Sequence, residues 1–305
     1  MSTAARASLA RPLPVMLFVL FMLFMLFMLF MLFILIMLIP VTSADDPRLA
    51  DYAQLRDRDL ARDAEGLFVG EQILIVERML SLPGVVRSVL VGEPFLRRVQ
   101  PLVADAIPLY VGPMKLLEAL AGFAVHRGVL AIGDRAALAR PDLAGLAGPS
   151  DLPRTLLLCE EITHVDNIGQ LFRTAAAFAV DGVLLSPGCH DPLYRRAVRV
   201  SVGHSLTMPW TRSDQWLDDL RQLKARHGFR LLGAALSPQA VPLDELPAPP
   251  RCAVVVGTEF AGLAPATLEL CDAIVRIPMA AGVDSLNVAV ATAVCLHRFS
   301  RGTRR

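Results

Sequence analysis

From Thr155 onward, the chain alternates between short apolar runs and segments whose apolar residues recur at helical spacing. The apolar runs are nearly continuous, which is typical of parallel strands that are buried on both faces. The pattern predicts an α/β fold in which helices cover both faces of a parallel sheet. The expected strands are TLLLCE, GVLLSP, LTMPW, RLLGAAL, CAVVVGTE and AIVRIPM, and the expected helices lie at about 167–180, 192–201, 213–227, 265–271 and 286–299.

A smaller α/β unit is predicted before this region. Residues 45–132 contain the strand candidates VRSVLVG, PLYVG and GVLAIG, with the helical segments LRRVQPLV and KLLEALAGF between them. Such alternation favours a mixed sheet with helices on its faces. Residues 133–154 are rich in Ala, Gly and Pro without an apolar period, so we expect a linker there. The predicted organisation is therefore a leader at 1–44, a small domain at 45–132, this linker, and a second domain at 155–305.

The leader contains an unbroken apolar run of 25 residues at 15–39. About 20 apolar residues suffice for a membrane-spanning helix, so a membrane anchor is one interpretation. Arg6 and Arg11 before the run also fit a signal peptide, although its apolar core is usually only about 7–15 residues long. The run repeats Met-Leu-Phe, a period that belongs to neither a helix nor a strand. The third interpretation is therefore a repeat in the coding DNA that is translated from a start codon set too far upstream, with Met37 as the next start. We predict that residues 1–44 form an isolated helix and contribute nothing to catalysis.

Charge and cysteine content exclude several classes of protein. The chain has 30 basic and 29 acidic residues, and the leader holds two arginines and no acid, so the remainder carries a net charge of −1. This excludes a generally basic nucleic-acid coat, and any RNA partner must bind a local patch. The five cysteines are odd in number and have no close metal-binding or redox spacing. They are typical of buried thiols in a reducing cytoplasm, and the sequence contains no metal-ligand cluster.

Ligands of parallel α/β sheets collect in the loops after the carboxyl ends of the strands. In the first such loop, Asp166 or Asn167 can cap the following helix. Gly169 and Arg173 are four residues apart and lie on one helical face. We expect the missing side chain at Gly169 to leave room beside the guanidinium, which is suited either to solvent or to a phosphate.

The next loop carries an aromatic and basic cluster within one or two helical turns. Its members are Tyr194, Arg195, Arg196 and Arg199. Such a cluster can bind an RNA backbone, and it can equally be a solvated helical face.

Two later loops complete the set. Gly257 and Gly262 bracket Glu259, which allows close backbone approach to a ligand. In the last loop Ser285 can cap a helix that begins near Leu286. The chain lacks G-x-G-x-x-G and G-x-x-x-x-G-K-[ST], which disfavours a standard dinucleotide fold or an NTPase.

Taken in order, these loops resemble the three motifs of the SPOUT superfamily, specifically its SpoU-type (TrmH-type) RNA ribose 2′-O-methyltransferases. The first motif, N-x-G-x-x-x-R, is matched by Asn167, Gly169 and Arg173; the second, G-x-E-x-x-G-[LM], by Gly257, Glu259, Gly262 and Leu263; the third, I-P-M followed by S-L-N-V, by 277–279 and 285–288. The resemblance is close over 155–299 and looser over 46–132. There the family usually has Glu-Gly where this chain has Glu71-Gln72.

The resemblance implies a parallel sheet with a deep trefoil knot, preceded by a small RNA-binding domain. It also implies a homodimer, a cytoplasmic location, and transfer of a methyl group from S-adenosylmethionine, without a metal, to a ribose 2′-hydroxyl of tRNA or rRNA. Gly257, Ile277 and Leu286 would line the cofactor pocket. Arg173 would stabilise charge at the reacting hydroxyl, and the residues expected to position the ribose are Asn167, Glu259, Ser285 and Asn287.

Two other functions are compatible with parts of the sequence. A catalytically silent RNA-binding protein could keep the same fold, although all three motifs are filled. A membrane-tethered protein is indicated only by residues 15–39. The motifs leave tRNA and rRNA both open as substrates.

Overall fold

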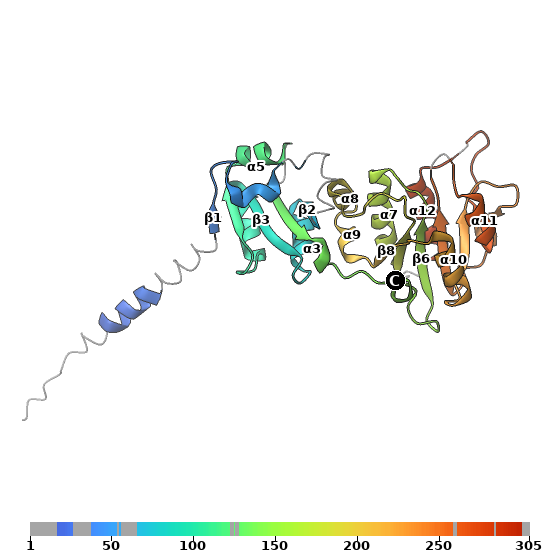
Figure 1. Cartoon of the computed structure of the whole chain (residues 1–305), viewed down its shortest axis with the longest axis horizontal. Helices are drawn as coiled ribbons and strands as arrows, with labels where there is room; N and C mark the ends of the chain where they lie inside the picture. The colour runs from blue at the N-terminus through green and yellow to red at the C-terminus, as the bar shows by residue number, and fades with distance from the viewer. Residues whose placement is uncertain are drawn as a thin grey trace, which may run out of the picture.

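The structure is a computed structural model that describes residues 17–26, 38–53, 55, 66–122, 125, 128–258, 261–283 and 285–300. Two α/β domains lie side by side in it, each built around its own sheet (Figure 1).

The N-terminal domain has a five-stranded mixed sheet in the order β1-β4-β3-β5-β2. Strand β4 is parallel to both of its neighbours, whereas β5 is antiparallel to both β3 and β2. The strands are β1 (Leu38–Pro40), β2 (Leu67–Glu71), β3 (Val86–Gly92), β4 (Leu109–Gly112) and β5 (Val129–Asp134).

Helices cover this sheet because their apolar residues recur on one face. The longer helices are α3 (Ile73–Leu80) and α5 (Met114–Ala121), and the shorter helical segments are η1 (Pro47–Tyr52), η3 (Glu93–Phe95), α4 (Leu96–Val99), η4 (Gln100–Leu102) and η5 (Arg135–Ala137). In α3, Ile75, Val76 and Met79 are buried. On the η1 side, the hydroxyl of the buried Tyr52 lies 2.8 Å from that of Ser88 in β3, which joins η1 to the sheet.

The first strand lies within the stretch assigned to the leader from the sequence. Strand β1 pairs with β4, with Leu38 opposite Leu109. The Val41 amide then donates to the Val111 carbonyl at 2.8 Å, and the Val41 side chain is only 2% exposed. The expected boundary at residue 44 was therefore too late, because residues 38–41 supply an edge strand and a core side chain.

The described part of the leader before β1 is a helix at 17–26, which lies apart from both domains (Figure 1). All of its side chains are exposed to solvent. Within the described ranges, no helix combines the length and apolar character needed to span a membrane. The rest of the apolar run between this helix and β1 lies outside the described residues.

The C-terminal domain has a seven-stranded sheet in the order β10-β12-β9-β11-β6-β7-β8, and every pair of neighbours is parallel. This confirms the predicted parallel α/β sheet. The strands are β6 (Arg154–Cys159), β7 (Gly182–Leu185), β8 (Trp210–Arg212), β9 (Arg230–Ala234), β10 (Val241–Pro242), β11 (Arg251–Val256) and β12 (Ala273–Arg276).

Both faces of this sheet are buried because its central strands β6 and β11 are apolar at consecutive positions after their first residues. Leu157 of β6 and Val254 of β11 pack with α7 (Val165–Ala177) and α12 (Val288–Phe299), whereas the alternate residues Leu156 and Ala253 pack on the opposite face. The helices α6 (Leu143–Ala147) and α10 (Trp216–Ala225) contribute to that opposite face. The remaining helical segments are α8 (Arg195–Val200), α9 (His204–Thr207), η6 (Leu243–Glu245) and α11 (Pro265–Leu270).

Several local expectations were wrong. The segment LTMPW was expected as a strand, but its first residues belong to α9, and β8 begins only at Trp210. Helix α7 begins at Val165 after His164, so neither Asp166 nor Asn167 caps it. The predicted linker contains α6, whose Leu146 is buried in the C-terminal core.

Strand β2 and helix α3 are joined by a residue in a strained conformation. Gln72 has φ 81° and ψ 141°, a combination that side chains with a Cβ rarely adopt. This position is the one at which the resembling family usually has glycine. Gln72 therefore stores strain next to Glu71, the last residue of β2.

We predict that residues 38–41 are needed for the N-terminal domain and that the residues before them are not. A chain that begins at Met37 should unfold like the full chain. A chain that begins at Asp45 loses β1 and the burial of Val41, so its unfolding free energy should fall by about 2 kcal/mol. Denaturant unfolding followed by circular dichroism measures both. Equal stability of the two shortened chains would contradict this assignment.

Relief of the strain at residue 72 should stabilise the protein. Gln72→Gly should raise the unfolding free energy by about 1 kcal/mol, which is the strain removed less the added entropy of an unfolded glycine. Gln72→Ala is the matched control, because it removes the same side chain but retains the Cβ, and it should bring no gain. Denaturant unfolding of both variants tests the assignment, which fails if they are equally stable.

Candidate active site

A pocket of about 460 Å³ lies at the carboxyl edge of the C-terminal sheet, beyond β9, β11 and β12. Its walls are mainly aliphatic and include Val256, Leu263, Val275 and Val288. The three residues expected to bind a cofactor, and one expected to position the ribose, all line it: Gly257, Ile277, Leu286 and Ser285. Residues from the second and third sequence motifs therefore meet around one cavity.

The loop after β11 forms one wall of the pocket and is closed by its own backbone. The Thr258 amide donates to the Gly262 carbonyl, and the Gly262 amide donates to the Thr258 carbonyl, each at 3.1 Å. A Cβ at Gly257 would overlap the carbonyl of Gly262. Glycine at 257 is therefore required by the closure of the loop itself. Glu259, expected from the second motif, lies outside the described residues.

A hydrogen bond joins the first motif to the third at the edge of this pocket. The Asn287 Nδ2 donates to the Oδ1 of Asn167 at 3.0 Å. The Asn287 Oδ1 also accepts from the Ala289 amide at 2.9 Å, which caps α12. The expected cap at Ser285 was therefore wrong, because α12 begins at Val288 with Asn287 as its cap. Asn167 is 6% exposed, whereas Asn287 is exposed to solvent.

Arg173 lies on an exposed position of α7. Within the described ranges it makes neither a hydrogen bond nor an ion pair. The expectation that Gly169 leaves room beside this guanidinium was wrong, because a Cβ at Gly169 would lie 2.6 Å from the Cβ of Val200 and 2.9 Å from the carbonyl of Ala197. Gly169 instead allows α7 to pack closely on α8.

The pocket has the size and chemistry to accept a nucleoside cofactor. Its volume falls within the range of about 300–1,000 Å³ that is usual for small-molecule sites. Aliphatic walls suit an adenine ring and a carbon chain, and the backbone groups of the three loops supply polar contacts. In the described part of the chain, no three His, Cys, Asp or Glu side chains are grouped to hold a metal ion.

The basic cluster on α8 is engaged with other parts of the protein. Glu71 of β2 accepts hydrogen bonds from Arg195 and Arg199, each at 3.0 Å, in a contact between the two domains. Arg196 forms a two-pronged ion pair with Asp166 of α7, with both distances at 2.6 Å.

Tyr194, the fourth member of that cluster, precedes α8 and is partly buried. Its ring makes an edge contact with His190 at 5.1 Å between centroids. The structure therefore keeps the four residues close together but directs two of the three guanidinium groups toward the N-terminal domain.

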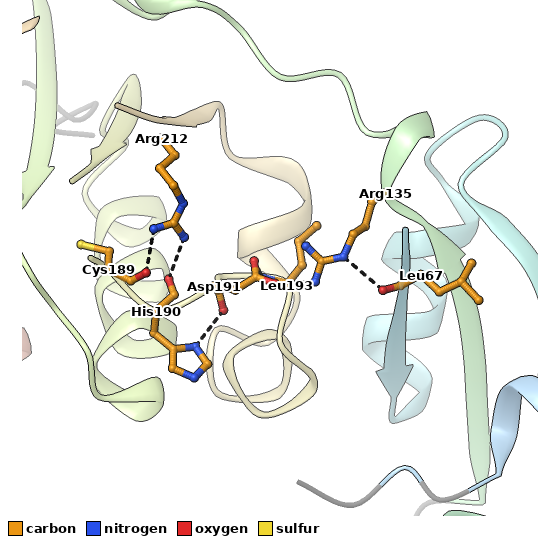
Figure 2. Close-up of polar contacts among 7 residues, drawn as sticks. All are labelled: Leu67, Arg135, Cys189, His190, Asp191, Leu193 and Arg212. Atoms are coloured by element: carbon orange, nitrogen blue, oxygen red, sulfur yellow. Dashed lines mark hydrogen bonds and ion pairs between the residues drawn. The ribbon is translucent and has the colours of Figure 1, made fainter. Parts of the chain in front are cut away.

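The loop between β7 and α8 is held from two sides (Figure 2). On one side Arg212 of β8 donates to backbone carbonyls of this loop, including those of Cys189 and His190 at 2.7 and 3.4 Å. On the other side Arg135, which follows β5, forms an ion pair with Asp191 and donates to the Leu67 carbonyl at 3.1 Å. Arg135 therefore links this loop to strand β2.

Sequence reasoning missed Glu160, which supports the wall of the pocket. Its carboxylate is buried, and it accepts from the Ala264 amide at 2.9 Å, from the Thr267 hydroxyl at 2.5 Å and from the Trp216 indole at 2.9 Å. These bonds fix the far end of the loop after β11. The available signal was an acid at the end of the apolar run TLLLCE, because a buried carboxylate there needs several donors.

The sequence and fold both match known methyltransferases. Residues 154–297 match the SpoU rRNA methylase family. A Mycobacterium tuberculosis protein named an uncharacterized tRNA/rRNA methyltransferase is 37% identical over 268 residues, which cover 86% of this chain and 91% of that protein. The 23S rRNA (guanosine-2′-O-)-methyltransferase RlmB of Haemophilus influenzae is 32% identical over 211 residues, which cover 67% of this chain and 85% of that protein.

Solved structures share the fold of both domains. An AdoMet-bound rRNA methyltransferase from Sinorhizobium meliloti superposes with a TM-score of 0.74 at 22% identity, covering 86% of this chain and 97% of that one. A structure described as an RNA 2′-O ribose methyltransferase has a TM-score of 0.71 at 25% identity, covering 85% and 97%.

The sequence and the fold are thus those of an RNA methyltransferase. The chain belongs to the SpoU family of RNA methyltransferases, and the family predicted from the three motifs is confirmed.

Two substitutions at residue 287 separate its cap from its bond to Asn167. Asn287→Ala removes both, so the unfolding free energy should fall by about 1 kcal/mol, the usual value of a helix cap. Asn287→Asp keeps a capping oxygen but replaces the Nδ2 donor. Both variants should lose methyl transfer by about tenfold or more, through misplacement of the site, while only the alanine variant loses stability. Full activity in Asn287→Asp would show that the bond to Asn167 is dispensable.

Proposed function

We propose that this protein transfers a methyl group from S-adenosylmethionine to a ribose 2′-hydroxyl of 23S rRNA. The observation that carries the proposal is the hydrogen bond between Asn167 and Asn287 at the edge of the pocket, because it unites the first and third motifs beside the second. The choice of rRNA is supported by the relative from Haemophilus influenzae, which is named a 23S rRNA methyltransferase.

The cofactor is S-adenosylmethionine, which supplies an electrophilic methyl group when bound. Gly257, Ile277 and Leu286 line its pocket. Ser285 and Asn287 lie at the edge of this pocket and, with Asn167, orient the ribose so that its oxygen approaches in line. Glu259, which lies outside the described residues, belongs to the same proposal as a further residue that positions the ribose.

Arg173 stabilises the negative charge that develops on the 2′-oxygen. A guanidinium stays protonated above about pH 12, so this residue does not act as a free base. Its planar fork instead binds the neighbouring phosphate through two parallel hydrogen bonds. A fixed positive charge beside the oxygen then lowers the cost of removing its proton.

A homodimer forms part of the proposal. Three aliphatic side chains spaced four residues apart, at and before α12, are exposed: Leu286 at 37%, Val290 at 50% and Val294 at 36%. A second copy of the chain would cover this apolar face. The knotted path implied by the family, and a cytoplasmic location where cofactor and RNA are both present, belong to the same proposal.

Transfer of a labelled methyl group tests the proposal. The full chain, given labelled S-adenosylmethionine, should methylate a 23S rRNA transcript at a ribose 2′-oxygen and leave tRNA transcripts unlabelled. Arg173→Ala should slow transfer by at least about a hundredfold, the scale of losing one charge-stabilising donor. Calorimetric binding of the cofactor should be unchanged in that variant.

A second variant of Arg173 and a control variant complete the same experiment. Arg173→Lys keeps a charge but loses the fork, so it should rescue poorly, and near-full activity would contradict two-pronged phosphate binding. The control is Arg226→Ala, an exposed arginine at the end of α10. Label on tRNA alone would overturn the assignment to rRNA, and label on neither would overturn the proposed activity.

A further inference from the structure

Three positively charged or ionisable side chains from the two domains lie close together beside the α7–α8 helix pair. Arg78 belongs to α3 of the N-terminal domain, Arg173 to α7, and His204 to the start of α9. Helix α9 contacts both α3 and α7. The Cδ of Arg78 lies 3.2 Å from the position that a Cβ would take at Gly203, so the Arg78 side chain lies against the turn that leads into α9.

The electrostatics of His204 agree with this arrangement. Partial burial lowers the pKa of His204 below its ordinary value, and the positive charges of Arg78 and then Arg173 lower it further. Both guanidinium groups are therefore close enough to oppose protonation of the imidazole. Within the described ranges, none of the three side chains forms an ion pair with an acid.

Arg78 also has a buried donor without an acceptor. Its Nη1 atom is shielded from solvent and has no hydrogen-bond partner among the described residues. A buried donor that lacks an acceptor costs free energy. The native protein tolerates this cost at the turn that leads into α9, next to His204.

Other arginines at the contact between the domains form ion pairs with acids of the protein itself. Arg195 and Arg199 bind Glu71, and Arg135 binds Asp191. These ion pairs hold β2, and with it α3, against the C-terminal domain. The arginines at Glu71 and Asp191 are therefore each paired with an acid of the protein, whereas Arg78 is not.

We propose that Arg78, Arg173 and His204 together bind one phosphodiester group of the RNA, at a site shared between the two domains. The inference rests on the proposed function and deepens it, because it assigns a substrate contact to the N-terminal domain. The guanidinium forks and the imidazole N–H supply several donors for the phosphate oxygens. Arg78 thereby holds the backbone while Arg173 acts at the neighbouring ribose.

A phosphate-binding role and a purely structural role for Arg78 predict opposite changes in the unfolding temperature of Arg78→Met. Methionine keeps much of the length of the side chain but removes the guanidinium and with it the buried donor. If Arg78 serves to bind phosphate, the full chain carrying Arg78→Met should unfold in chloride at the same temperature as the wild type or higher. If Arg78 serves the fold, the variant should unfold at a lower temperature. Arg226→Met, on the exposed end of α10, is the matched control.

Two probes test the ligand. Inorganic phosphate, compared with chloride at equal ionic strength, should raise the unfolding temperature of the wild type and of Arg226→Met but not of Arg78→Met. A 23S rRNA transcript should bind Arg78→Met about tenfold more weakly, the value of one charged hydrogen bond. The slope of its log affinity against log salt should fall by about 1, and cofactor binding should not change.

The outcomes separate this inference from the proposed function. A phosphate response and a salt slope that are unchanged in Arg78→Met would overturn the shared site, even if the wild type methylates RNA. Loss of the phosphate response in Arg78→Met, in a wild-type protein that methylates no RNA, would support the anion site and overturn the proposed activity. A lower unfolding temperature together with an unchanged phosphate response would assign Arg78 to the fold alone.

Discussion

The carboxylate of Glu71 is the group on which the relation between the two domains depends. It is 7% exposed, and it accepts hydrogen bonds from Arg195 and Arg199 across the contact. Burial of a carboxylate is costly unless it is paired, and loss of one member of a buried pair costs about 3–5 kcal/mol. Glu71 therefore specifies where β2 meets α8. Arg135 extends the same contact to the loop at Asp191.

The strain at Gln72 follows from this contact. Glu71 ends β2 with its side chain turned toward α8, and α3 must start two residues later at Ile73. The positive φ at Gln72 turns the chain between these two constraints. Because α3 carries Arg78, the same turn sets the direction in which that guanidinium approaches α9. A local backbone distortion thus serves an arrangement made by residues more than a hundred positions apart.

The sequence predicted best where one property of a segment decides its structure. Apolar runs such as TLLLCE are buried parallel strands in the structure, as predicted. The motif loops lie at the carboxyl edge of the sheet, because the loops that follow parallel strands meet at that edge. LTMPW failed because five apolar and small residues do not distinguish a strand from the single turn of α9. The acidic partner of Arg195 and Arg199 could not be predicted from the sequence. Glu71 lies over 120 residues away along the chain, and pairing across domains leaves no local pattern.

The pairing of these arginines changes the explanation of how a nearly neutral protein can bind RNA. A row of arginines in the sequence suggests a basic surface, but internal ion pairs cancel much of that charge before any RNA arrives. What remains for a ligand beside the α7–α8 helix pair is the few cations there without an acidic partner in the described structure, Arg78 and Arg173. Binding through so few charges depends less on salt than binding through a basic tail does. In the proposed reaction, specificity then comes from placement of the ribose, and the contact at Glu71 and the hydrogen bond between Asn167 and Asn287 hold together the elements that surround it.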